Sequence, residues 1–226
     1  MGLFVEPLYR LVGDSGLLVE YGDTIAEEIN LKVRAMAMSL TRHPPEGVVE
    51  VIPTYRSILI PYDSAVTGPE KLRSALEKLE NRLEQIELPP AETVRIPVCY
   101  GGALGPDIGF VAEHNNLSVD EVIDIHSQPE YLIYMIGFTP GFPYLGGLDD
   151  RLVTPRLETP RIKVPAGSVG IANNQTGMYS VESPGGWRLI GRTPLMLFAP
   201  ARKHPFLYRA GDRLKFVPVS REEFDR

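Results

Sequence analysis

The 226-residue chain contains a single cysteine, Cys99, and no long run of apolar residues. One cysteine excludes an intramolecular disulfide and is typical of a protein from a reducing compartment. Cys99 lies within a strand pattern without an acid–base partner nearby, so we expect a buried structural thiol. No apolar stretch approaches the roughly 18 residues of a membrane span, and the N-terminus lacks a signal-peptide core. We therefore expect a soluble cytoplasmic protein without membrane contact.

The chain also lacks a basic surface. Its 23 Lys and Arg residues are outnumbered by 29 Asp and Glu residues, which gives a formal net charge of −6. Nucleic-acid-binding proteins carry clusters of Lys and Arg that neutralise phosphates, and the sequence contains no such cluster. This composition argues against a nucleic-acid partner. With 43% hydrophobic residues, the chain can bury the core of one large domain or two small ones.

Several common catalytic motifs are missing. The glycines at residues 101–105 are not followed by the Gly-Lys-Ser/Thr of a Walker loop, so we expect a turn there. Ala166 stands where a nucleophile elbow requires glycine. The four histidines lack the spacing of zinc ligands, so no metal site is expected. His126, near the end of an expected helix, is interpreted as complementing the helix dipole.

Glycine and proline are plentiful, and they divide the chain into two parts. Residues 137–226 hold 21 of the 42 glycines and prolines, and the longer segment before them holds the other 21. Such a high density of glycine and proline indicates short strands and tight loops. Closing the strands into a barrel removes exposed edges. The predicted strands cover residues 168–173, 178–183, 188–193, 195–200 and 213–219, and a last short helix is expected at 221–226.

The earlier part alternates strand and helix patterns. Hydrophobic stripes predict one helix between Thr24 and Pro44 and another between Thr67 and Pro89, since proline pushes the preceding residue out of the α region. Thr24 and Glu27 have the spacing of a capping box. Strands are predicted at residues 6–13, 16–22, 47–55, 56–63 and 92–100.

Two short helical pieces follow between residues 106 and 128. Ser118 and Glu121 have capping-box spacing in the second piece, and a strand at 131–138 comes next. The order of elements predicts an α+β protein. We expect a ferredoxin-like sandwich over residues 1–100 and a β-barrel domain over 101–226, the latter with a short helical lead-in.

Three glycine-rich segments, residues 137–148, 159–180 and 182–194, combine flexibility with isolated polar groups. Glycine lets the backbone approach a ligand closely, and consecutive amides bind anions. Arginine can donate two parallel hydrogen bonds to a carboxylate or a phosphate. The first segment, GFTPGFPYLGGL, also carries three aromatic rings. The polar groups of the other two segments are Arg161, Lys163, Ser168, Gln175, Thr176, Ser183 and Arg192.

Each feature also has a purely structural interpretation. The glycine pairs at 146–147 and 185–186 are typical of turns. A lone tryptophan such as Trp187 is more often part of the core than a ligand contact, and Arg161 and Arg192 are consistent with surface ion pairs. The residues alone indicate a β-rich domain whose loops can hold a small anionic ligand, and they leave these alternatives open.

Four segments, residues 13–22, 96–156, 159–198 and 211–220, resemble a known family over nearly the whole chain. It is the B-subunit family of bacterial and archaeal 5-oxoprolinase (PxpB), also labelled allophanate hydrolase subunit 1, which includes the histidine-kinase inhibitor KipI. The resemblance implies a ferredoxin-like N-terminal domain and a cyclophilin-like C-terminal β-barrel. Two departures concern one loop. Asn173 and Asn174 replace expected small glycines, which asparagine's tolerance of left-handed geometry should accommodate, and Ser180 replaces an expected proline.

The resemblance implies one component of an ATP-dependent enzyme. In that family subunits B and C activate 5-oxoproline with ATP, and the A subunit helps to complete ring opening to glutamate. ATP with Mg is expected to act in the assembly, with no cofactor bound tightly by this chain alone. Phosphorylating a lactam oxygen needs positioned cations and amide donors more than a protein nucleophile, which agrees with the missing motifs.

The resemblance also directs the choice of site residues, although it assigns none of them a catalytic role. The candidates for anion contact are Arg161, Lys163 and Arg192. The candidates for hydrogen bonds to substrate are Gln175, Thr176 and Ser183. The expected cleft walls are Phe138, Phe142, Tyr144 and Trp187.

Two other functions remain open. A KipI-like member would bind a histidine kinase through the barrel, for which the aromatic loop could supply an exposed apolar patch. The family label also suggests a part of a urea-linked carboxylase or an allophanate-degrading system. The chain, however, has neither a biotin-attachment lysine motif nor an amidase Ser-Lys signature.

Overall fold

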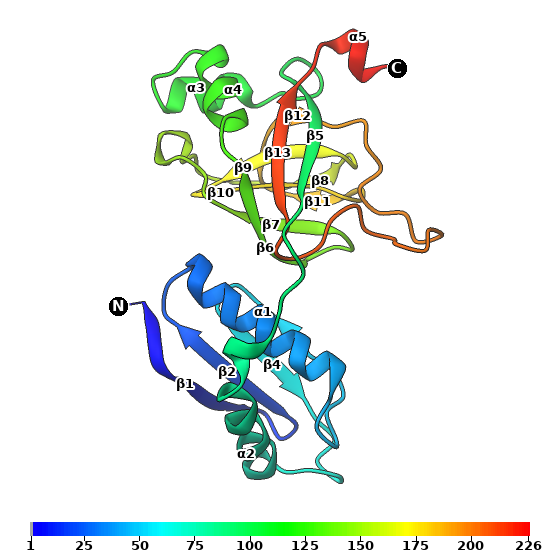
Figure 1. Cartoon of the computed structure of the whole chain (residues 1–226). Helices are drawn as coiled ribbons and strands as arrows, with labels where there is room; N and C mark the ends of the chain where they lie inside the picture. The colour runs from blue at the N-terminus through cyan, green and yellow to red at the C-terminus, as the bar shows by residue number, and fades with distance from the viewer. Residues whose placement is uncertain (1) are drawn as a thin grey trace. The chain divides into compact units, whose positions relative to one another are not determined.

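The computed structural model describes residues 2–226, which form two compact units. The first ends at Pro90 and the second begins at Ala91, and each has its own hydrophobic core (Figure 1). Strand β5 (Thr93–Tyr100) lies before the expected boundary at residue 100, yet it belongs to the sheet of the second unit. Within residues 2–226, no helix is long and apolar enough to cross a membrane.

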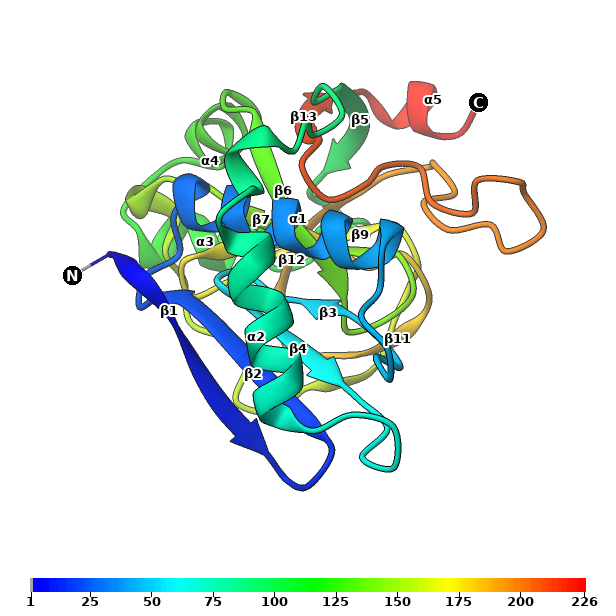
Figure 2. The same cartoon turned by 60° about the horizontal axis from the view of Figure 1, so that its bottom comes forward.

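The first unit is an antiparallel sheet with helices packed on one face (Figure 2). Its strands, in spatial order, are β1 (Leu3–Val12), β2 (Gly16–Gly22), β4 (Ser57–Pro61) and β3 (Ile52–Pro53). The helices are α1 (Glu27–Arg42) and α2 (Pro69–Glu80), followed by the 3₁₀ turn η1 (Leu83–Gln85). Apolar residues at helical spacing, such as Val33 and Met36, are fully buried against the sheet, as an amphipathic helix requires.

Three details of this unit differ from the prediction. The capping box of Thr24 and Glu27 is wrong, because Ala26 is the N-cap of α1 and makes no side-chain cap. The strand expected at 47–55 shrinks to β3, where Pro53 cannot donate to a ladder. Helix α2 ends at Glu80, well before Pro89, and its apolar stripe continues into η1 through the buried Leu83.

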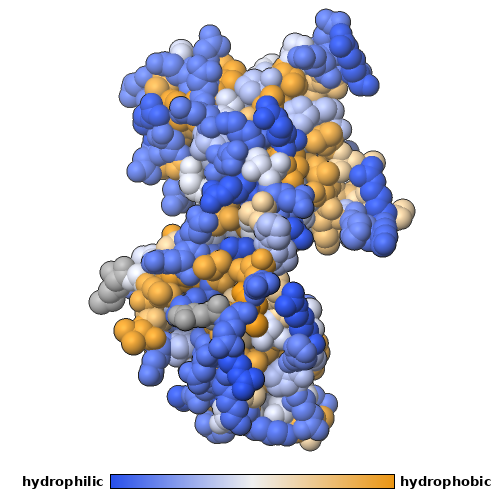
Figure 3. Space-filling model, viewed as in Figure 1, coloured by the Kyte–Doolittle hydropathy of each residue, from blue (hydrophilic) through white to orange (hydrophobic). Residues whose placement is uncertain are grey.

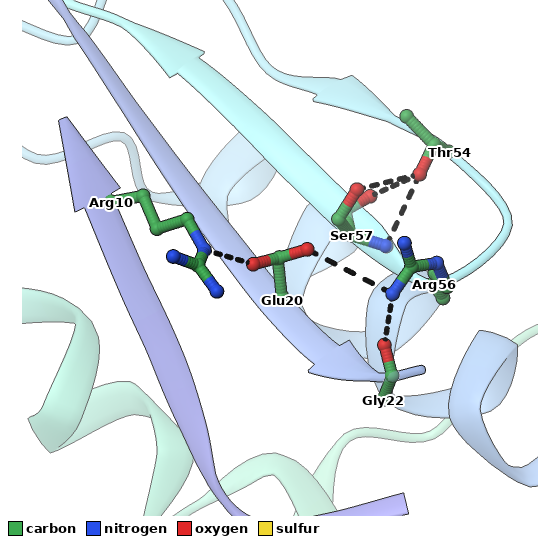
Figure 4. A network of polar contacts seen from close by, with 6 residues as sticks. All are labelled: Arg10, Glu20, Gly22, Thr54, Arg56 and Ser57. Atoms are coloured by element: carbon green, nitrogen blue, oxygen red, sulfur yellow. Dashed lines mark hydrogen bonds and ion pairs between the residues drawn. The ribbon is translucent and has the colours of Figure 1, made fainter. Parts of the chain in front are cut away.

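A polar network ties together neighbouring strands of this sheet (Figure 4). Glu20 on β2 accepts a hydrogen bond from Arg10 on β1, and its other carboxylate oxygen lies 3.8 Å from Nη1 of Arg56. Arg56 also donates to the carbonyl oxygen of Gly22 at 2.6 Å. The Arg10 side chain is 62% exposed and that of Arg56 39%, whereas the Glu20 side chain between them is only 15% exposed, so two solvent-exposed arginines cover a largely buried carboxylate.

The second unit is a nearly closed seven-stranded barrel with spatial order β10-β9-β12-β5-β13-β6-β7. The terminal strands β10 and β7 also pack against each other, which leaves little exposed edge. Strands β13 and β5 pair in parallel, whereas the other pairs are antiparallel. The remaining strands are β6 (Tyr131–Gly137), β7 (Phe142–Gly146), β9 (Ser168–Ala172), β10 (Gln175–Met178), β12 (Arg188–Arg192) and β13 (Arg213–Pro218).

Smaller elements surround the barrel. Strands β8 (Arg161–Val164) and β11 (Ser183–Gly185) form a separate two-stranded sheet. Helices α3 (Ile108–His114) and α4 (Val119–Ser127) precede β6, a 3₁₀ turn η2 (Asp150–Leu152) follows β7, and α5 (Arg221–Phe224) ends the chain. The predicted capping box of Ser118 and Glu121 on α4 is confirmed.

The strand predictions for the barrel are partly wrong. Residues 142–146, expected as loop, form β7 and pair with β6. Residues 195–200 form no strand and make only the isolated bridge between Phe198 and Phe206. The segment at 178–183 is split, since β10 ends at Met178 and β11 begins at Ser183. Tertiary pairing therefore overrode local pattern at these positions.

A chain of hydrogen bonds crosses the barrel core at His126. Its Nδ1 lies 2.8 Å from the Tyr100 hydroxyl, and its Nε2 lies 2.8 Å from the Thr176 hydroxyl. Because Thr176 donates to the carbonyl oxygen of Gly170 at 3.1 Å, its oxygen accepts from Nε2, and Nδ1 accepts from Tyr100. Burial lowers the pKa of His126 to about 3. The ring is therefore neutral near pH 7, and the helix-dipole interpretation is wrong because it requires a charged ring.

Candidate functional site

A pocket of about 440 Å³ opens on the second unit, and five aromatic rings line it. We call it the aromatic pocket. Its size is within the usual range for small-molecule sites. The rings belong to Phe138, Phe142, Tyr144, Tyr179 and Trp187. All four residues expected as cleft walls thus line one pocket, together with Tyr179.

Phe142 is the centre of this aromatic cluster. Its ring centroid lies 5.2 Å from that of Tyr144, 5.5 Å from that of Trp187 and 5.7 Å from that of Tyr179, each edge to face. These are favourable aromatic geometries. Phe142 is 2% exposed, whereas Phe138 is 66% exposed. The rings therefore form a packed wall with one exposed aromatic residue on the lining.

The turn between β6 and β7 holds Phe138 in an unusual conformation. Phe138 has φ of 62°, and the Thr139 amide donates to the Gly137 carbonyl oxygen at 2.7 Å across it. A bulky residue with positive φ costs roughly 1–2 kcal/mol. Two hydroxyls hold this turn: Ser180 donates to the carbonyl of Pro140 at 2.6 Å, and Tyr208 to that of Gly141 at 2.7 Å. Ser180, which replaces an expected proline, thereby helps to fix the edge of the aromatic pocket.

Gly185 and Gly186 form another part of the lining. A Cβ atom on Gly185 would lie 2.2 Å from the Tyr179 hydroxyl oxygen, so a side chain there would displace the ring. That hydroxyl also makes a hydrogen bond with the Trp187 backbone. Gly185 lies in strand β11 and not in the expected turn, and glycine is required there for close packing.

Arg156 is the only charged residue that lines the aromatic pocket in the part of the chain described by the structure. It is exposed and follows the buried Thr154 on the segment that leads to β8. Gln175, at the start of β10, also lines the pocket. The pocket thus combines aromatic walls, one cation, one amide side chain and two glycines, a set suited to a small anionic ligand.

Comparison with known proteins identifies the family. The model of the carboxyltransferase domain, subdomain C and D, matches residues 7–208. The chain is 44% identical to the 5-oxoprolinase B subunit of Bacillus subtilis over 94% of its own length and 93% of the relative's. The chain belongs to the 5-oxoprolinase B-subunit family.

Solved structures support the same fold for this family member. A conserved uncharacterized protein from Pyrococcus horikoshii is 51% identical, with 96% of this chain and all of that chain covered and a TM-score of 0.58. The protein TTHA0988 is 35% identical, with 94% of this chain but only 40% of that longer chain covered and a TM-score of 0.79. The α+β architecture with a nearly closed barrel is therefore shared.

The structure places the three candidate anion-binding residues of this family member outside the lining of the aromatic pocket. Arg161 forms an ion pair with Asp107 at 2.8 Å, and Asp107 also accepts from the Leu189 amide at 2.6 Å. Lys163 forms an exposed ion pair with Glu182 at 3.0 Å. Arg192 donates to the carbonyl oxygen of Ala166 at 2.8 Å and lines a separate pocket of about 420 Å³.

The three hydrogen-bonding candidates are also separated. Gln175 lines the aromatic pocket, but Thr176, its neighbour on β10, is 1% exposed and bonds to His126 in the core. The Ser183 hydroxyl is buried without a hydrogen-bond partner among the described residues, next to Pro184 of the pocket lining. Of the three candidates, only Gln175 lies on the lining of the aromatic pocket.

Sequence reasoning missed Arg156 although a signal was present. The triplet Thr-Pro-Arg occurs twice, at residues 154–156 and 159–161. The sequence pattern favours only the arginine of the second triplet, Arg161, because that triplet begins a glycine-rich segment. The fold reverses this preference: Arg161 pairs with Asp107, while Arg156 lines the aromatic pocket.

Proposed function

We propose that this chain is the B subunit of an ATP-dependent 5-oxoprolinase, acting with subunits C and A to convert 5-oxoproline to L-glutamate. The near-full-length similarity to the 5-oxoprolinase B subunit of Bacillus subtilis carries this proposal. We further propose that the aromatic pocket is this chain's contribution to the substrate site. A shared active site is consistent with the chain's lack of a Walker loop and a nucleophile elbow.

The aromatic pocket suits the chemistry of 5-oxoproline. The substrate is a small five-membered lactam ring that carries a carboxylate. The half-buried rings of Tyr144 and Trp187 provide apolar contact for the lactam ring, and Gln175 supplies an amide side chain on the same lining. Packed aromatic walls also exclude water from one side of the lactam, which strengthens polar contacts made there.

The same pocket does not fit magnesium ATP. A triphosphate carries about four negative charges and is held in other enzymes by several cations, amides and a metal ion, whereas one arginine lines this pocket and no carboxylate does so among the described residues. Within residues 2–226, no group of three His, Cys, Asp or Glu side chains is placed to hold a metal ion. We therefore propose that the nucleotide is bound elsewhere in the assembly.

Reconstitution tests this function. The chain should be inactive alone, and mixing it with subunits C and A from the same organism should release ADP and glutamate from ATP and 5-oxoproline. A coupled ADP measurement with each component omitted in turn is the assay. If the chain alone turns over 5-oxoproline, the shared site is wrong. If the three proteins form a complex without 5-oxoproline-dependent ADP release, the enzyme assignment fails and a kinase-binding role becomes the better hypothesis.

A further inference from the structure

We infer that Arg156 recognises the substrate carboxylate in the aromatic pocket, so that this pocket selects an anionic lactam over its uncharged analogue. The inference rests on the proposed function, but it assigns a role to a residue that the family resemblance did not indicate. Three observations support it: the backbone around Arg156 is held on both sides, its charge is uncompensated, and its neighbours on the lining are aromatic.

The backbone on both sides of Arg156 is anchored to the barrel. Before it, the Thr154 and Asn173 backbones exchange hydrogen bonds at 3.2 and 2.7 Å, and Arg188 donates to the carbonyl oxygen of Pro155 at 3.2 Å. After it, the Leu157 amide donates to the carbonyl oxygen of Gly186 at 2.8 Å. These contacts hold the segment beside Gly186, itself a lining residue, so an exposed side chain is presented from a fixed position.

The charge of Arg156 is uncompensated. Arg161 and Lys163 each have a carboxylate partner. Arg156 makes no ion pair or hydrogen bond with any described side chain, and it is the sole charged lining residue among them. Burial raises the pKa of the Tyr179 hydroxyl, and the positive charges of Arg156 and Arg161 partly offset that increase. The lining therefore carries one positive charge and no carboxylate among the described residues.

The chemistry of the lining favours a carboxylate on a small ring. Guanidinium binds carboxylate through two parallel charge-assisted hydrogen bonds. Apolar walls beside such a contact reduce competition from water. With the lactam ring against Tyr144 and Trp187, a carboxylate substituent could reach Arg156 on the lining of the same pocket. A lactam without the carboxylate would keep the aromatic contacts and lose the ionic one.

Trp187 offers a direct binding assay, because it is the single tryptophan of the chain and lines the aromatic pocket. Its fluorescence should be titrated in the full-length chain with 5-oxoproline and with 2-pyrrolidinone, the same ring without the carboxylate. The wild-type chain should prefer 5-oxoproline by about tenfold or more, the size expected for a charged hydrogen bond. Arg156→Gln should remove that preference and leave 2-pyrrolidinone binding unchanged.

Arg202→Gln is the matched control, since Arg202 is exposed, does not line the pocket and undergoes the same change of charge. This variant should keep the wild-type preference. Arg156→Lys should recover part of the preference for 5-oxoproline, because lysine restores the positive charge without the two parallel hydrogen bonds of a guanidinium group. A wild-type chain that binds the two ligands equally or binds neither overturns the inference, as does an Arg156→Gln chain that retains the preference.

Kinetics of the reconstituted enzyme separate this inference from the proposed function. Arg156→Gln should raise KM for 5-oxoproline about tenfold or more while kcat changes little, because a carboxylate held equally in ground and transition states affects binding alone. An active enzyme whose KM is unchanged overturns the role of Arg156 and leaves the proposed function intact. An inactive three-protein mixture, with carboxylate preference still seen by Trp187 fluorescence, refutes the proposed function and supports the role of Arg156 as an anion-recognising residue.

Discussion

The polar network around Glu20 in the first unit differs in environment from the one around His126 in the barrel. Around Glu20, whose side chain is 15% exposed, Arg10 and Arg56 reach solvent, and solvent and salt weaken their attraction. In the barrel, the Tyr100–His126–Thr176 chain crosses the core. Thr176 adjoins Gln175 on β10, so the buried network helps to position a strand that lines the aromatic pocket.

The two units also differ in how much of their outermost strands is exposed. Strand β1 is the end strand of its sheet and exposes apolar side chains, including Val5 at 100% and Leu11 at 65%; Figure 3 shows apolar surface over this strand. In the barrel, β7 and β10 pack together and leave little free edge. From this comparison we propose that the barrel depends more on buried contacts than the first unit does, and the following experiments test that proposal.

The largest expected effect is physical separation of the units. We propose that they fold as independent domains, since each has its own core. Glu87 and Glu92 flank the boundary and are exposed, so limited digestion with a glutamate-specific protease should cut there. A resistant C-terminal fragment that retains Trp187 fluorescence should accumulate. Loss of both units at the same rate, without an intermediate fragment, would contradict independent folding.

The next effect concerns His126. His126→Ala removes a packed ring and leaves the Tyr100 hydroxyl without its partner, which should cost about 4 kcal/mol of barrel stability. Denaturant unfolding followed by Trp187 fluorescence measures it. The control is His204→Ala, an exposed histidine of the same unit, which should cost under about 0.5 kcal/mol. Equal losses for the two variants would show that burial of His126 does not account for the effect.

Acid titration sharpens the same comparison. The folded-state pKa of His126 is about 3, below the unfolded value of about 6.5, so between these values the unfolded chain binds the additional proton. Barrel stability should be undiminished above about pH 6.5 and should fall as the pH is lowered, by about 1.4 kcal/mol per pH unit from this group. His126→Gln should lack that contribution, and identical slopes for the two proteins would show that His126 is not the cause.

Local signals predicted those features of the fold that depend on neighbours in sequence. The Ser118 capping box, the amphipathic helices and the final helix need only a few adjacent residues. Strand β7 could not be predicted this way, because its glycines and prolines indicate loop and only pairing with β6 makes it a strand. The interpretation of Asn173 succeeded because left-handed backbone is a local property: its φ is 53°.

The site was harder to predict because it depends on which charges find partners. The grouping of Phe138, Phe142, Tyr144 and Trp187 rested on the family resemblance, since the local pattern of Trp187 favours core packing. Arg161 and Arg156 occur in identical triplets, and nothing local distinguishes them. Asp107 lies 54 residues before Arg161 in the chain, and only the fold shows that it neutralises Arg161 and leaves Arg156 available.

A smaller effect is expected where a candidate anion-binding residue has a structural role. Arg161→Ala should destabilise the barrel by about 2 kcal/mol, the usual range for a hydrogen bond to a charged group, because Asp107 has only 11% side-chain exposure. Lys163→Ala on the same strand should cost under about 0.5 kcal/mol, since its pair with Glu182 is exposed. Chemical denaturation of both variants gives the comparison, and a larger loss for Lys163→Ala would refute this assignment.

The smallest effect should come from the polar network around Glu20 in the first unit. Glu20→Gln removes the charge that Arg10 and Arg56 share, and because both arginines are exposed to solvent we expect a cost of about 1 kcal/mol. The cost should be measurable at low ionic strength and should largely vanish in about 1 M salt, where the screening length falls to about 3 Å. Because Trp187 lies in the barrel, circular dichroism of residues 1–90 expressed alone is the suitable probe once a cooperative unfolding transition has shown that this unit folds by itself. A cost that persists unchanged in high salt would mean that Glu20 is held as firmly as the buried network around His126, and the contrast between the two units would then rest on burial of the histidine alone.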